Sequence, residues 1–161
     1  MDEPLTGRLY DLQRLLAAVV ECAVDGLTDA PERAFVAPGQ EVAWDCDQVW
    51  VRVLTVEPRY PTSSNVRGAT QAPNCGPNAW DVSIGVGAIR CVAVMDDQGS
   101  PPSSEVVTEN GHEMTRDMLE LLVAIQCCAL PVPLRIGSWA PQGPMGGYAG
   151  GEWTVSLTLL N

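Results

Sequence analysis

The chain has 161 residues, of which 46% are hydrophobic and 18% are charged, a balance typical of a folded domain with its own core. Its formal net charge is −11, from 20 acidic and 9 basic residues, and all the basic residues are arginine. This charge argues against a protein that grips nucleic acid through its phosphates, and the lack of lysine excludes Schiff-base and P-loop lysine chemistry. No apolar run approaches the ~20 residues that cross a bilayer, and the acidic first residues predict no cleaved signal peptide.

The first predicted element is an amphipathic helix over residues 8–27, where apolar residues recur at steps of three and four. We expect Thr6 to be its N-cap and Gly26 to end it. Residues 28–47 have the composition of a loop, with a short extended piece expected within the sequence PERAFVAPG.

Two strands and a long loop are predicted next. Residues 48–58 alternate and are rich in β-branched side chains, which predicts a strand covered on both faces. Residues 57–79 contain four prolines and no helical period, so we expect a long loop. The second strand, residues 80–97, carries Gly85 and Gly87 on one face, and a bulge, a bend or the close approach of another chain would each explain them.

The last third of the chain predicts a helix, a second long loop and a strand. The helix covers residues 110–128, with Asn110 and Glu113 as a variant of the capping box. The loop is the glycine- and proline-rich stretch 137–151, and the strand is Glu152–Leu160. A short extended piece in PLRIGSWA is expected to pair with that strand.

The expected fold is therefore α+β, in the order α-β-β-α-β, as a single domain over residues 1–161. Two helices packed on one face of a small, mostly antiparallel sheet form the natural two-layer arrangement.

A search for chemistry finds no complete motif. The run GPMGGYAGG lacks a following Lys-Ser or Lys-Thr and leads into a strand, so we expect a flexible connection in preference to a phosphate site. His112 is the single histidine, and in HEMTR Arg116 stands where the second ligand of a zinc motif belongs. We expect no catalytic residue, no cofactor and no metal site.

The cysteines and tryptophans give less specific signals. The six cysteines form no CxxC pair, and we expect most of them to be reduced core residues in a cytosolic setting. Four tryptophans fall at the edges of predicted elements, where they either plug the ends of the sheet or contact another protein: Trp44, Trp80, Trp139 and Trp153.

Three segments carry a resemblance to a known family: the helices LYDLQRLLAAVVECAVDGL and MTRDMLELLVAIQC, and the ending GGEWTVSLTLL. Together with the proline-rich stretch and the long loop between two strands, they resemble the tail-terminator proteins of long-tailed bacteriophages. The resemblance lies in the order of elements and includes no catalytic motif. An arginine-only composition would suit a phage of an actinobacterial host.

The resemblance implies a structural virion protein at the head–tail junction, made in the host cytoplasm and without enzymatic activity. Such proteins form a hexameric ring that caps the tail tube. The implied partners are further copies of the chain, the major tail tube protein and the head-closure or connector protein. DNA passes through the lumen without specific binding, and no membrane is involved.

Residues of both long loops are the expected subunit or partner contacts. Arg59, Tyr60 and Arg67 lie on the first loop, and Trp139 and Tyr148 on the second. Three alternatives stay open: another neck component such as a head-closure or adaptor protein, a small enzyme that uses Cys75 or Cys91, and a cytosolic binding module.

Overall fold

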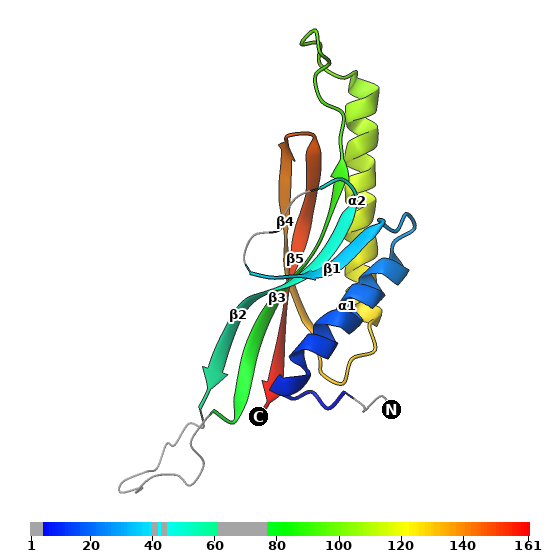
Figure 1. Ribbon diagram of the computed structural model, residues 1–161. Coiled ribbons are helices and arrows are strands. Elements are labelled where there is room, and N and C mark those ends of the chain that lie inside the picture. Colours follow the sequence, from blue (N-terminus) through cyan, green and yellow to red (C-terminus); the bar gives the residue numbers. More distant parts are fainter. Residues whose placement is uncertain (1–4, 40–41, 43–44, 61–76) are drawn as a thin grey trace, which may run out of the picture.

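A computed structural model describes residues 5–39, 42, 45–60 and 77–161 of the chain. Figure 1 shows two layers, a five-stranded sheet and two helices that both lie on one face of it. The elements follow in the order α1 (Leu12–Gly26), β1 (Arg33–Ala37), β2 (Gln48–Arg59), β3 (Ala79–Cys91), α2 (Ser104–Cys127), β4 (Arg135–Met145) and β5 (Tyr148–Leu160), with a short 3-10 turn, Leu9–Asp11, before α1.

The sheet has the strand order β1-β2-β3-β5-β4. Strand β1 pairs with β2 in parallel, and every other pair is antiparallel. The prediction of an α+β fold with two helices and a mostly antiparallel sheet is thus confirmed. The predicted order is wrong in detail, because β1 and β4 are strands that it did not count.

Helix α1 lies where its apolar period placed it, but it begins differently. Thr6 does not cap the helix; its N–H and hydroxyl instead donate to the Asp11 carboxylate, at 2.8 and 2.6 Å. Gly26 is the last helical residue, as predicted. A Cβ added at Gly26 would lie 2.4 Å from the Cβ of Ala124, so glycine there lets the end of α1 approach α2 closely.

Helix α2 begins six residues earlier than predicted, at Ser104. The hydroxyl of Ser103 accepts from the N–H of Val106, so Ser103 is the cap in place of Asn110. The Asn110 side chain accepts from the N–H of Ala93 instead. The early turns were missed because their side chains are almost all exposed and therefore show no apolar period.

The predicted loop over residues 137–151 is wrong, since most of it belongs to the hairpin of β4 and β5. Gly146 and Gly147 form the turn with φ of +58° and +85°, the left-handed backbone that favours glycine in a tight hairpin. The two prolines of β4 are tolerated because β4 is an edge strand. The expected pairing of PLRIGSWA with the last strand is confirmed.

The strand predicted over residues 80–97 also ends early, at Cys91. Of the first predicted loop, residues 61–76 lie outside the described part of the chain, while β2 reaches Arg59 and β3 starts at Ala79. The short extended piece predicted before β2 is confirmed as β1.

The main core lies between the helices and the sheet, where β-branched residues of the strands meet the apolar stripes of α1 and α2. A second, smaller cluster of Ala37, Trp50 and Ile89 lies on the other face of the sheet. The first four residues of β2 are buried, which confirms that this strand is covered on both faces there. The main core includes Leu16, Val19, Val51, Ile84, Val86, Leu121, Ile125, Val155 and Leu159.

Candidate functional site

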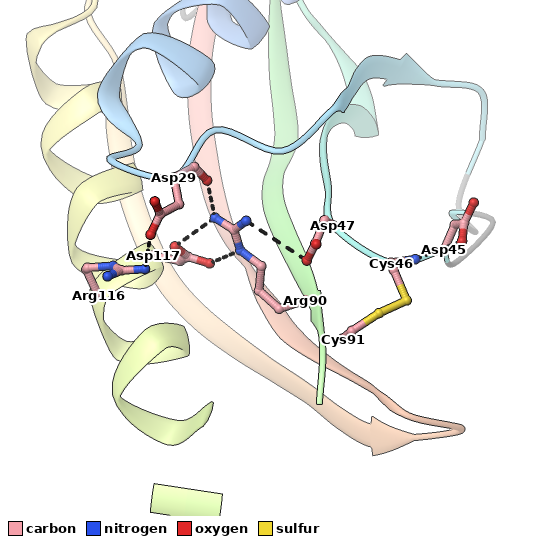
Figure 2. A network of polar contacts seen from close by, with 8 residues as sticks. All are labelled: Asp29, Asp45, Cys46, Asp47, Arg90, Cys91, Arg116 and Asp117. Carbon is pink, nitrogen blue, oxygen red and sulfur yellow. Dashed lines mark hydrogen bonds and ion pairs between the residues drawn. A yellow bond between two sulfur atoms is a disulfide. The ribbon is translucent and has the colours of Figure 1, made fainter. Parts of the chain in front are cut away.

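A largely buried arginine of one strand contacts three other segments of the chain (Figure 2). Arg90 in β3 donates from Nε and Nη2 to the two carboxylate oxygens of Asp117 in α2, at 2.7 and 3.1 Å. Its Nη2 also donates to the backbone oxygen of Asp29, and Asp47 lies 4.0 Å from Nη1. Arg116 Nη2 donates a further hydrogen bond to the Asp29 carboxylate, at 2.6 Å.

The surroundings of Arg90 keep it charged. Burial by itself lowers the pKa of the guanidinium, but the hydrogen bonds and charge of Asp117, helped by Asp47 and Asp29, outweigh burial and raise the pKa of Arg90 above its usual range. The network holds the α1–β1 connection, β3 and α2 in one arrangement. Its members come from separate segments of the chain and follow no motif spacing, so the sequence did not predict the network.

Four cysteines are paired, which corrects the expectation that most are reduced. Cys46 and Cys91 form a disulfide beside the Arg90 network, in Figure 2, and the disulfide leaves Cys91 without a free thiol. Cys22 and Cys128 tie α1 to the residue after α2, with their Cα atoms 5.7 Å apart. The expectation failed because each pair is distant in sequence and only the fold brings it together. Cys127 is a free, exposed thiol, and Cys75 lies outside the described residues.

The two glycines of β3 make room for side chains of neighbouring strands. A Cβ added at Gly85 would fall 2.3 Å from the Glu152 carboxyl carbon, and one at Gly87 would fall 2.4 Å from the Trp50 ring. Glu152 accepts from Trp50 Nε1 at 2.7 Å and from Arg52 Nε and Nη2 at 2.7 and 2.8 Å. The bare backbone predicted on this face is therefore filled within the chain, without another molecule.

Two residues predicted as contacts lie at the exposed end of the strands β2 and β3. Arg59 is the last residue of β2, and its Nη2 lies 2.8 Å from Asp81. The hydroxyl of Thr158 also donates to Asp81, and this bond followed by the Arg59 charge lowers the pKa of Asp81. Tyr60 follows β2 with 64% of its surface exposed. Arg67 lies outside the described residues.

The other two predicted contacts, Trp139 and Tyr148, lie in strands and face partly inward. Trp139 packs on Trp153 with ring centroids 5.6 Å apart, and both pack against the main core. Trp153 also donates to the backbone oxygen of Met118 in α2. Tyr148 packs against the second cluster. These tryptophans close the edge of the core, one of the two roles that their positions allowed.

A shallow groove lies at the same end of the molecule as Arg59. It has a volume of about 390 Å³, and we call it the arm-end groove. Arg135 at its rim is exposed and has no ion pair with another described residue. The exposed side chains of Tyr10, Tyr60 and Leu160 belong to this end too. The groove is lined by Arg59, Asp81, Pro133, Leu134, Arg135, Ser156, Leu157 and Thr158.

The opposite end of the molecule is acidic. Residues 92–113, which we call the acidic tip, contain five acids and no arginine. They include the first turns of α2 and the connection before it, at the far end of the ribbon from the C-terminus in Figure 1. The tip also exposes four large apolar side chains: Val94, Met95, Val106 and Val107.

Other candidate chemistry finds little support in the part of the chain described. His112 lies on the exposed tip. No group of three or more His, Cys, Asp or Glu side chains is placed to hold a metal ion among the described residues. Within those same ranges no helix is long and apolar enough to cross a membrane.

Comparison with protein-family models and with curated proteins finds no match to this chain.

Proposed function

We propose that the protein is a structural component of a phage virion, a tail terminator that forms a ring at the head–tail junction. The observation that carries the proposal is the pair of unlike ends. Exposed apolar side chains gather with arginines at one end and with acids at the other. Contiguous exposed apolar surface marks sites of protein contact, and these exposed side chains are the candidates for such a surface here.

Unlike ends suit the symmetry of a ring. A contact between two different surfaces is heterologous, and repeated copies of it close into a ring when the rotation allows. The net charge of −11 supports the conduit part of the proposal, because an acidic wall repels the DNA backbone and keeps it from sticking.

The partners proposed with this function are the major tail tube protein on one side of the ring and a head-closure or connector protein on the other. Arg59 and Tyr60 would contact a neighbouring copy or the tube, since both are exposed at the end of β2. Arg67, Trp139 and Tyr148 complete the set of proposed contacts, the last two through their exposed edges.

The test is electron microscopy of tail tubes assembled with and without the purified protein. We expect a ring at one end of each tube and an arrest of further growth. Replacing Tyr60 and Arg67 together with alanine should leave a folded chain that no longer forms rings. Tubes that keep growing, with no protein at their ends, would contradict the terminator function. Binding only to the head connector would favour the adaptor alternative.

A further inference from the structure

We propose that the first turns of α2 in one copy of the chain dock into the arm-end groove of a second copy, with glutamates of the helix meeting Arg135 and Arg59. The inference rests on the proposed function, and it names the two surfaces that would join neighbouring subunits. Both surfaces are fully described by the structure.

The docking helix carries three acids along one face. Glu105, Glu109 and Glu113 follow one another at steps of four, so they line one face of α2. Like charges at this spacing destabilise an isolated helix by a few tenths of a kcal/mol for each pair. Glu105 lies in the first turn, where the helix dipole favours an acid, and Arg116 follows Glu113 by three residues, so Glu109 is the acid of this face with no such local offset. A basic surface on another molecule would remove this repulsion.

The same helix exposes apolar surface beside its glutamates. Val106 and Val107 are 40% and 54% exposed, and residues 104–109 are exposed throughout. Val106 borders the glutamate face, whereas Val107 lies on the opposite side of the helix. An exposed acidic helix face with an apolar residue at its edge has the form of a helix that lies in a groove of a partner.

The arm-end groove has the complementary composition. Pro133, Leu134 and Leu157 give it an apolar floor, and Arg59 and Arg135 lie at its rim. Asp81 is already engaged by Arg59 and Thr158, while Arg135 has no ion pair among the described residues. The groove therefore offers an unused cation over an apolar surface. Arg8 is a third exposed arginine at this end, where its backbone forms a parallel β-bridge with that of Leu160.

One copy cannot bring its own two surfaces together. Helix α2 has 24 residues, which at about 1.5 Å per residue makes it ~36 Å long, and it runs from the acidic tip toward the end that holds the groove. The contact must therefore form between two molecules. A second copy of the chain is the occupant that the complementary charges favour, since every copy carries both surfaces.

A charge exchange tests the contact. We expect Glu109→Arg or Arg135→Glu alone to raise the protein concentration needed for half-assembly at least tenfold. A tenfold change corresponds to about 1.4 kcal/mol of contact free energy. The chain that carries both changes should assemble within about threefold of the wild type, because each contact again pairs opposite charges. Sedimentation velocity at several concentrations measures the assembly, and circular dichroism shows that each variant is folded.

A matched control separates the specific contact from net charge. Glu32→Arg changes the charge equally at an exposed residue before β1. Combined with Arg135→Glu it should not restore assembly. The inference is overturned if the Glu109→Arg and Arg135→Glu chain stays as weak as the single variants, if Glu32→Arg restores assembly equally well, or if the wild type is monomeric at every concentration. Rings that persist in all variants also overturn this contact and leave the terminator function standing, since tube capping is measured separately.

Discussion

At the scale of single residues, buried polar pairs are the strongest constraints in the molecule. The side chains of Arg90 and Asp117 are 12% and 4% exposed, whereas those of Arg33 and Asp45 are 50% and 58% exposed. An ion pair that is largely shielded from water leaves a costly charge behind when one partner is lost, while an exposed pair contributes little.

The first prediction follows from this contrast. Asp117→Asn should lower the free energy of unfolding by about 3 kcal/mol, because Arg90 loses its charged partner in a buried position. Arg33→Ala, which removes an exposed pair, should cost less than about 1 kcal/mol. Urea denaturation of both variants measures the difference. Equal losses would show that the Arg90 network does not hold the segments together.

The glycines of β3 give a second prediction. Gly87→Ala forces a methyl group against the Trp50 ring and should cost about 1 to 3 kcal/mol, as overpacking does. Gly111→Ala is the matched control, because nothing lies within 4 Å of its added Cβ and it is in helix α2. That change should stabilise the protein by up to about 1 kcal/mol. In thermal unfolding, the melting temperature should fall for Gly87→Ala and rise for Gly111→Ala. A change of the same sign in both variants would contradict the packing described.

Asp11 gives a prediction about pH. The Thr6 hydroxyl and N–H are the main groups that lower the pKa of Asp11 from 3.8. A carboxyl whose folded pKa is depressed stabilises the fold above its unfolded pKa, and this stability is lost as the pH falls through the folded pKa. Thr6→Val should therefore be less stable than the wild type at neutral pH, with a difference that shrinks below pH 3.8. A difference that is constant down to about pH 2 would contradict this role of Thr6.

At the scale of elements, the two helices are fixed to one another by a close contact and a disulfide. Gly26 lies against Ala124, and Cys22 is bonded to Cys128. The disulfide joins residues 106 apart in sequence, so it closes most of the chain into one loop. In the loop-entropy picture such long loops give large stabilisation.

Removing this disulfide should therefore lower the free energy of unfolding by about 4 kcal/mol. The variant is Cys22→Ser with Cys128→Ser, measured in urea without reductant. Cys127→Ser is the control and should leave stability unchanged, because its thiol is free and exposed. A digest of the unreduced protein should contain the linked peptides of Cys22 and Cys128. Free thiols at both positions would contradict the pairing.

Sequence patterns predicted these elements unevenly, for physical reasons. Strand β2 and helix α1 bury one face or both, so their apolar period is strong. The start of α2 and the edge strand β4 bury little, so their residues carry no period, and the prolines and glycines of β4 read as a loop. The disulfides and the Arg90 network join distant segments, and spacing along a single sequence does not encode such contacts.

The interface residues show the same limit. Arg59 and Tyr60 follow the strand predicted over residues 48–58, which favoured exposed positions for them. In the structure both side chains are exposed, at the end of β2. Trp139 and Tyr148 were assigned to a loop and lie in paired strands instead. The arm-end groove combines residues of β2, β3, β4, β5 and the segment before β4, and no local motif marks it.

At the scale of the whole molecule, charge and apolar surface are divided between two ends. The acidic tip and the arm-end groove lie at opposite ends of α2, and large apolar side chains are exposed on the tip and, outside the groove itself, at the groove's end of the molecule. This polarity is the basis for a head-to-tail contact between copies. Because exposed charges contribute to the contact, we expect assembly to weaken as the salt concentration rises.

The most direct test of self-assembly is the mass of the protein in solution, by light scattering behind a sizing column over a range of concentrations at low salt. We expect a mass that rises from that of the 17.2 kDa chain to six times that value, either alone or once tail-tube protein is added. A chain that stays monomeric at every concentration, with and without the tube protein, would contradict the ring.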